Sequence, residues 1–307
     1  MKSKILSVTT YLSMLIIFFL SVFSCEKEID VELKDTEPKL VVEGVIENGE
    51  FAYVSLSKSS PYFANIDTNS FNNMFISDAL VIVSDGIEYD TLKYDTIPFF
   101  PPFRFQGSKI KGKENTTYSL RIEYNNTIYT ATTKILQVIP IDSVRYQYRM
   151  GSDSLGLLRF YANDPVDQTN FYRTSCLDLN TDISSEIMTW LYPSNSVTDD
   201  VMFNGKKVNA AMYKGKNPTK SPEYYREHSE DWWAFKMDDD IIVRLSQIDY
   251  QGFMFWRTTE QVVQTGDNPF AAPTTVQTNI YPKALGCWCG YASSTKRVII
   301  TEDILIP

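Results

Sequence analysis

The sequence predicts an all-β fold, and two observations indicate it. Aromatic side chains make up 14% of the 307 residues and stand among many Thr, Val and Ile. In addition, short alternating segments are separated by turn motifs along most of the chain. β-Branched and aromatic side chains pack well on pleated, half-buried surfaces, and a period of two indicates a strand with one buried face. We therefore expect a mainly β body with few helices.

Short strand candidates follow one another through the first half of the chain. Asn48-Gly49 and Asp85-Gly86 each connect two of them and are strong hairpin signals. Residues 98–103 contain three prolines, which exclude this segment from a central strand. About seven short strands over some hundred residues predict an immunoglobulin-like β-sandwich for residues 39–139. The clearest candidates are residues 40–46, 51–56, 79–83, 87–94, 118–124 and 127–132.

Residues 140–307 predict a second β-rich domain that begins after Ile139-Pro140. Residues 223–233 and 250–264 are its best helix candidates, although the second is rich in Thr and Val and is also compatible with a strand. We expect one or two short helices. The mostly apolar or alternating segments are 157–162, 171–177, 241–248, 254–263, 284–291 and 298–304.

Residues 1–24 have the features of a secretory signal peptide. Lys2 and Lys4 precede an apolar stretch, and the small residue Ser24 precedes Cys25. The apolar stretch is shorter than the roughly 20 residues of a membrane-spanning helix. A cysteine after a small residue is the lipobox pattern, although Phe23 is bulkier than usual there. We expect lipid on Cys25 rather than a plain cleaved signal or a core cysteine, with residues 25–38 as a tether. More than one acyl chain gives stable anchoring in a membrane.

The charge of the chain argues against nucleic acid as a partner. The formal net charge is −9, and removal of the leader makes the body more negative. A phosphate-binding surface needs clustered Lys and Arg. Lys109, Lys111 and Lys113 are the nearest approach to such a cluster, and they fit a solvated strand or turn.

Cys176, Cys287 and Cys289 remain once Cys25 is lipidated, an odd number in an oxidising compartment. Packing in the core and a disulfide from Cys176 are both compatible with the sequence, so the pairing stays open. Cys287 and Cys289 would share one face of a strand. A zinc site needs four N or S ligands, and His228 is the single histidine. We therefore predict no metal site.

No pattern of catalytic residues stands out. The sequence has no Gly-x-Ser-x-Gly, His-Glu-x-x-His or Cys-x-x-Cys motif and no phosphate-binding Gly-rich loop. Among 38 acidic residues, no spacing singles out the carboxylate pair of a glycosidase. Residues 178–182 begin like a calcium loop but lack its Gly and final Glu. We expect no enzyme and no cofactor, and cation binding near Asp178 or Asp238 stays open.

Trp232 and Trp233 follow Tyr224 and Tyr225 closely in the sequence. Such aromatics are usually core residues. Tyr and Trp are also enriched at interfaces, so these tryptophans are candidates for contact with a sugar or a protein partner.

Several motifs resemble a known family. Those in the first half are Leu40-Val41-Val42-Glu43-Gly44, Val54-Ser55-Leu56-Ser57 with Pro61-Tyr62, and Asp78-Ala79-Leu80-Val81. Those in the second half are Asn163-Asp164-Pro165, Asn170-Phe171-Tyr172-Arg173, Asn268-Pro269-Phe270 with Pro273, Asn279-Ile280, Ala284-Leu285-Gly286 and Gly290-Tyr291. Together they resemble the Bacteroidota lipoproteins of domain-of-unknown-function family 4249 (DUF4249) over nearly all of the mature chain. Lys283-Ala284 departs from the glycines of the family, and Cys287 and Cys289 are particular to this chain.

The resemblance implies a location and a partner but no activity. Residues 25–30 resemble the signal that sends Bacteroidota lipoproteins to the outer face of the outer membrane. Members of the family are typically encoded beside TonB-dependent receptors, which implies a lipid-anchored, cell-surface accessory subunit of a nutrient importer. Pro269 and Phe270 would lie in a loop that contacts the partner or is a plain turn. The alternative is an independent surface lipoprotein that binds a glycan or a peptide. Ligand identity, membrane face and oligomeric state stay open.

Overall fold

The structure is a computed structural model. It describes residues 37–60, 73–166, 168–180, 188–230, 232–266, 268, 272, 274–282 and 284–306. Cys25, Pro269 and Phe270 lie outside the described residues, as do the predicted leader and nearly all of the predicted tether. Residues 38–307 form one compact unit. Among the described residues, no helix has the length and apolar character needed to cross a membrane.

The body is mainly β, which confirms the predicted fold class. Helix α4 (Tyr250–Thr265) confirms the second helix candidate, and Asp249 caps it by accepting a hydrogen bond from Gly252 N at 2.8 Å. Helix α3 (Pro222–Glu227) is shorter than predicted, because the chain leaves the helix at His228.

The strands before α3 are β1 (Leu40–Glu47), β2 (Phe51–Lys58), β3 (Leu80–Ser84), β4 (Tyr89–Thr96), β5 (Phe103–Lys111), β6 (Thr116–Tyr124), β7 (Thr127–Ile135), β8 (Ile141–Tyr148), β9 (Leu155–Asn163), β10 (Phe171–Asp178), β11 (Val197–Asp199) and β12 (Lys207–Met212). Those after α3 are β13 (Phe235–Lys236), β14 (Asp240–Ile248) and β15 (Leu285–Ile299), and a 3-10 turn (Glu302–Ile304) follows.

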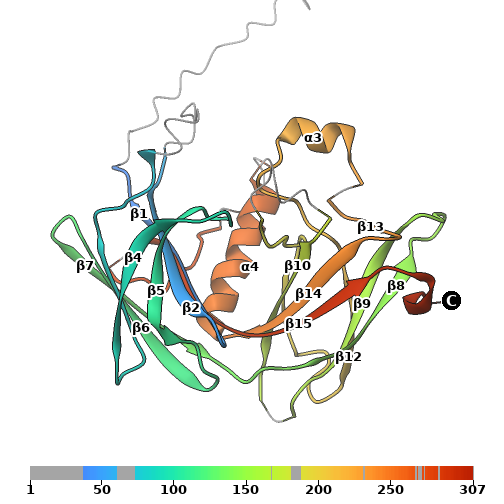
Figure 1. Cartoon of the computed structure of the whole chain (residues 1–307), viewed down its shortest axis with the longest axis horizontal. Helices are drawn as coiled ribbons and strands as arrows, with labels where there is room; N and C mark the ends of the chain where they lie inside the picture. The colour runs from blue at the N-terminus through green and yellow to red at the C-terminus, as the bar shows by residue number, and fades with distance from the viewer. Residues whose placement is uncertain are drawn as a thin grey trace, which may run out of the picture. The chain divides into compact units, whose positions relative to one another are not determined.

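One large sheet runs through both predicted domains. Its strand order is β11-β10-β14-β15-β1-β2-β5-β4-β3-β6-β7. The first and last of the long strands, β1 and β15, pair in parallel over residues 41–47 and 285–291. Figure 1 shows β15 running from the N-terminal strands to the C-terminal ones. The two predicted domains therefore share a sheet.

The N-terminal strands enclose the first hydrophobic core. β4 pairs with β3 through residues 89–92 and with β5 through residues 93–96, so the sheet folds over at β4 and its two parts face each other. Side chains between these parts come from β1 to β7, and Trp288 of β15 joins them. A Cβ on Gly44 would lie only 2.6 Å from Cε3 of Trp288. Gly44 therefore leaves the space that the indole ring fills.

The C-terminal strands enclose a second core. A smaller sheet has the order β12-β9-β13, and β8 pairs with β9. Its buried side chains include Leu158 and Phe160, which meet Val243 and Leu245 from β14 of the large sheet. The first core draws on residues 40–135 and 280–292, whereas the second begins at Ile139. The change from the first core to the second thus lies close to Ile139-Pro140, although strands of one sheet contribute side chains to both cores.

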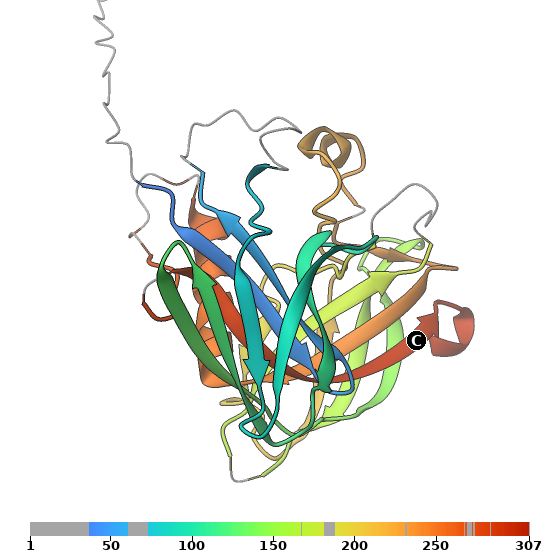
Figure 2. The ribbon, with the colours of Figure 1, turned by 60° about the vertical axis from the view of Figure 1, so that its left-hand side comes forward.

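Helix α4 covers a third surface, the face of the large sheet opposite to both cores. Figures 1 and 2 show the helix lying against the strands of this sheet. Phe253 of the helix packs with Cys287, Cys289 and Tyr291 of β15, which alternate with the core residue Trp288. We call this surface the α4 face.

Candidate functional site

Trp232 and Trp233 line one open pocket at the surface. Both side chains are half-buried, and Leu157 and the exposed Tyr213 line the same pocket, which has a volume of about 500 Å³. The guanidinium carbon of Arg149 lies 4.7 Å from the centroid of a Trp233 ring. The amino group of Lys216 lies 5.7 Å from the centroid of a Trp232 ring. The structure thus brings together the two tryptophans that the sequence singles out, with a cation over each of them.

The upstream tyrosines have a different role from the tryptophans. Tyr224 stacks on the His228 ring with centroids 4.5 Å apart. The hydroxyl of Tyr225 accepts a hydrogen bond from Asn217 N at 2.6 Å. These contacts hold the loop around α3 together. The residues that extend the aromatic pocket are Tyr213 and Arg149, which the sequence analysis did not select.

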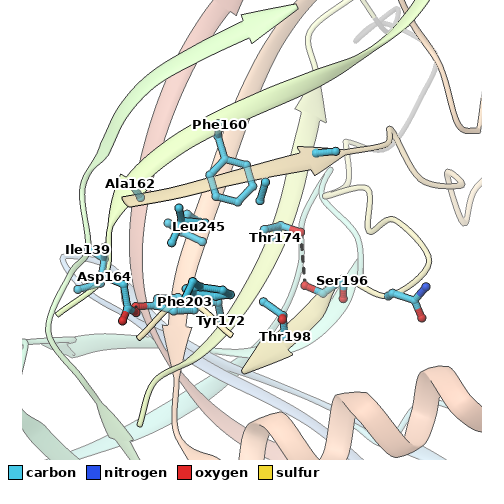
Figure 3. A pocket seen from close by; sticks show the side chains of 14 residues that line it. Ile139, Phe160, Ala162, Asp164, Tyr172, Thr174, Ser196, Thr198, Phe203 and Leu245 are labelled. Carbon is cyan, nitrogen blue, oxygen red and sulfur yellow. Dashed lines mark hydrogen bonds between the residues drawn. The ribbon is translucent and has the colours of Figure 1, made fainter. Parts of the chain in front are cut away.

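A second pocket lies inside the C-terminal part, between β9 and β12 on one side and β10 and β11 on the other. Its volume is about 200 Å³. Figure 3 shows Phe160 and Leu245 among its apolar lining, with Asp164, Tyr172 and Ser196 as polar members.

The polar groups of this inner pocket already have partners. Asp164 accepts a hydrogen bond from the hydroxyl of Tyr172 and another from Gly205 N at 2.8 Å. Ser196 Oγ donates one to Glu260 Oε1 at 2.5 Å, and outside the pocket lining Asn170 N donates one to Asp200 Oδ2 at 2.8 Å. Burial and the Asp164 carboxylate raise the pKa of Tyr172 well above its usual value, so the hydroxyl stays protonated. Two motifs that resemble the family, residues 163–165 and 170–173, therefore meet in a network that holds the loop after β11.

Arg173 of β10 is sandwiched between two aromatic rings on the α4 face. Its guanidinium carbon lies 3.3 Å from the centroid of a Trp256 ring and 3.6 Å from that of Tyr192. The same group donates a hydrogen bond to the hydroxyl of Tyr291 at 2.9 Å, and Trp256 Nε1 donates to that hydroxyl at 2.8 Å. The arginine thus joins β10, α4, β15 and the segment after residue 187.

A second buried arginine, Arg244 of β14, lies on the same face. Its guanidinium carbon is 3.8 Å from the centroid of a Trp190 ring. It donates hydrogen bonds to Ser175 Oγ at 2.9 Å, to the hydroxyl of Tyr192 at 2.8 Å and to Glu47 Oε2 at 3.2 Å. Sequence reasoning missed both arginines. The sequence pattern that could have identified these arginines is the alternation of polar with apolar residues along β10 and β14.

The three described cysteines are free thiols, and all are buried. Cys176 packs in the second core, whereas Cys287 and Cys289 lie on the α4 face with their sulfur atoms 2.7 Å apart. Cys176 is therefore not paired with either of them, because its core lies on the opposite side of the sheet. Burial raises the pKa of the Cys176 and Cys287 thiols, so neither is an activated nucleophile.

Of the acidic residues near which cation binding stayed open, Asp178 pairs with a lysine, whereas Asp238 is exposed and its neighbour Asp239 faces the same lysine. The amino group of Lys214 lies 2.6 Å from Asp178 Oδ2 and 3.7 Å from Asp239 Oδ2. Within the described part of the chain, no group of three or more His, Cys, Asp or Glu side chains has the arrangement of a metal site. The remainder of the calcium-like segment, from Thr181 on, lies outside the described residues.

In a comparison with protein families, residues 26–297 match the model described as "Domain of unknown function (DUF4249)". None of the curated proteins compared with the chain matches it.

Proposed function

Because the chain belongs to the DUF4249 family, whose model spans most of its length, we propose that its function is binding rather than catalysis. In this proposal it is a bacterial lipoprotein held at the outer membrane by lipid on Cys25, exposed at the cell surface, and an accessory subunit of a TonB-dependent nutrient importer. The leader, the lipobox and the motifs that resemble Bacteroidota lipoproteins support the location and the partner.

The pocket around Trp232 and Trp233 is the observation that carries the proposal of binding. Its volume of about 500 Å³ falls within the range of roughly 300–1,000 Å³ that ligand pockets occupy. Its aromatic side chains offer large, rigid contact area, and Trp, Tyr and Arg dominate the energetics of protein interfaces. Tyr213, with 47% of its surface exposed, is accessible to a partner.

Affinity purification of the tagged full-length protein from detergent-solubilised outer membranes of its native host tests the partner. We expect a stoichiometric TonB-dependent receptor in the eluate, identified by mass spectrometry. A native complex without any such receptor would refute the accessory role.

Replacement of both tryptophans by alanine is expected to abolish recovery of the receptor. An interface hot spot contributes about 2 kcal/mol or more, so the loss of even one of the two contacts should weaken binding at least roughly thirtyfold. Tyr89→Ala is the matched control, because this tyrosine has 71% of its surface exposed on β4, away from the pocket. Equal recovery of the receptor by the double variant and the control would show that the pocket is not the contact.

Cys25→Ala is expected to move the protein from the membrane fraction to the soluble fraction, because the acyl chains require this thiol and the free amine that cleavage creates. Immunoblots of the two fractions and metabolic labelling with a palmitate analogue measure the change. A Cys176→Ala variant, which removes a buried thiol instead, should still incorporate the label. Labelling of the Cys25→Ala protein would contradict the assigned anchor.

The same pocket also favours a second candidate function, independent binding of a surface glycan or peptide. Trp232, Trp233 and Tyr213 line an open pocket in which sugar rings or apolar side chains could stack. Glycan and peptide arrays distinguish this role: specific array binding by protein that purifies without a receptor would favour it over the accessory role.

A further inference from the structure

Four polar side chains on the α4 face form a cluster that the proposed function does not use. They come from adjacent strands: Glu43 from β1, Tyr53 from β2, and Arg104 and Gln106 from β5. Tyr53 stands directly opposite Gln106 in the β2–β5 register, and Arg104 lies two residues along the same strand. On β1, β2 and β5 these positions alternate with Val42, Val54 and Phe105, which are buried in the first core. We call the four residues the Arg104 cluster.

Arg104 lacks the partners that a buried guanidinium normally has. Its carbon Cζ lies 4.2 Å from the centroid of the Tyr53 ring. Its Nε is buried and has no hydrogen-bond partner, and the side chain makes no hydrogen bond or ion pair with any other described residue. Burial lowers the pKa of Arg104, with Tyr53 and Glu43 acting in the opposite direction. The neighbouring Arg173 and Arg244 also lie over aromatic rings, but their guanidinium groups donate hydrogen bonds in addition.

The other members of the cluster also have unused hydrogen-bonding capacity. Gln106 Nε2 donates to Ala52 O at 3.3 Å, but its Oε1 is buried without a partner. Neither the Glu43 carboxylate nor the Tyr53 hydroxyl forms a hydrogen bond within the described residues. Burial raises the pKa of Glu43 and of Tyr53. All four side chains are half-buried, so they belong neither to the dry core nor to the open surface.

This arrangement costs stability in the free protein. A buried polar group without a partner loses its hydration and gains nothing in return, and native proteins contain few of them. Here two such atoms, Arg104 Nε and Gln106 Oε1, lie in the same cluster. Groups that destabilise the folded state in this way are typical of sites whose partner is a ligand.

We propose that the Arg104 cluster binds a neutral, multiply hydroxylated ligand, a sugar in chemical class. Arg104 and the Tyr53 hydroxyl supply donors, whereas Glu43 and Gln106 Oε1 supply acceptors. The positive charge of Arg104 and the negative charge of Glu43 cancel, so the cluster has no net charge and favours a ligand without net charge. Neighbouring hydroxyl groups of a sugar donate and accept hydrogen bonds at the same time, as this mixed set requires. This site lies on other strands than the tryptophan pocket and does not depend on the importer.

Calorimetry on the detergent-solubilised full-length protein tests the site. The probes are D-glucose, D-galactose, D-mannose and N-acetyl-D-glucosamine, with glycylglycine as a zwitterionic comparison. We expect at least one sugar to bind, and Arg104→Met and Glu43→Gln to weaken that binding by about tenfold or more, since hydrogen bonds to charged groups are lost. Arg121→Ala, which removes an exposed arginine of β6 outside both sites, should leave it unchanged. Absence of binding by all four sugars, binding of glycylglycine alone, or unchanged binding by Arg104→Met would overturn the proposal.

The unfolding midpoint of the same variants separates a binding role from a structural one. Methionine preserves apolar contact with Tyr53 and removes the unpartnered nitrogen, so Arg104→Met is expected to raise the midpoint measured without sugar. Sugar should then raise the midpoint of the unmodified protein but not that of the variant. A lower midpoint for Arg104→Met would show that the guanidinium stabilises the fold, and would contradict the proposal. Neither result depends on recovery of a receptor, so failure here is distinguishable from failure of the accessory role.

Discussion

Replacement of Trp288 by alanine is expected to lower the free energy of unfolding by about 3–5 kcal/mol, the range for removal of a large buried aromatic side chain. Trp288 is fully buried in the first core, where it lies among strands from both faces of the folded sheet. Its indole N–H donates to Tyr118 O at 3.2 Å. Gly44 leaves room for the ring, so the surrounding strands cannot close the cavity without moving backbone.

Urea unfolding followed by circular dichroism measures this loss. Trp233→Ala is the matched control, because it removes the same side chain from the half-buried pocket and should cost much less. A loss for Trp288→Ala no larger than that of the control would mean that the first core does not depend on β15.

Replacement of Arg173 by methionine is expected to destabilise the fold by about 3 kcal/mol or more, as in other cases where one partner of a buried charged network is removed. The change removes two stacking contacts, with Trp256 and Tyr192, and the hydrogen bond to Tyr291. It also removes the positive charge that lowers the pKa of Glu43 and Glu260 against the effect of their burial. Helix α4 and the segment after residue 187 should loosen first, because Arg173 joins them to the sheet.

Hydrogen exchange and urea unfolding together measure this result. Arg173→Lys should recover little of the lost stability, since an ammonium group cannot reproduce a planar group stacked between two rings. Arg121→Ala is the control: Arg121 and Glu123 form an exposed ion pair at 2.8 Å, and such pairs contribute at most about 1 kcal/mol. Equal effects of the Arg173 and Arg121 variants would contradict the role assigned to the stack.

Local sequence patterns predicted many elements of the fold, because the formation of a strand or a turn depends on residues that are close in the sequence. Alternation and Asn-Gly or Asp-Gly turns located β1, β2 and β3 closely. Strand β5 was missed, although Lys109 and Lys111 lie on its exposed side as a solvated strand requires. Residues 284–291 and 298–304 were predicted as separate segments, yet β15 runs unbroken from Leu285 to Ile299 and ends before most of the second. The polar residues in the middle of β15 interrupt the apolar pattern, so the sequence does not indicate one continuous strand. Pairing with β14 keeps the strand continuous.

The candidate sites were predictable only in part. Sequence reasoning selected Trp232 and Trp233 by residue type, but their pocket also needs Arg149 and Tyr213 from other segments. The Arg104 cluster had no sequence signal, because its strands are adjacent in the sheet while Glu43 and Arg104 are far apart in the chain. Burial of Arg173 and Arg244 was equally hidden, since a lone arginine in a strand is more often exposed.

The sequence by itself determined the all-β class, most of the strands and the family, since composition, alternation and motifs are properties of short segments. It left residues 250–264 open between a helix and a strand. Only the tertiary structure decided that β1 pairs with β15, that one sheet serves two cores, and that polar side chains gather unpartnered on the α4 face. The physical reason is that strand pairing and burial join residues over any sequence distance. A local sequence pattern does not indicate which strand another strand pairs with, or which residues surround a charged side chain.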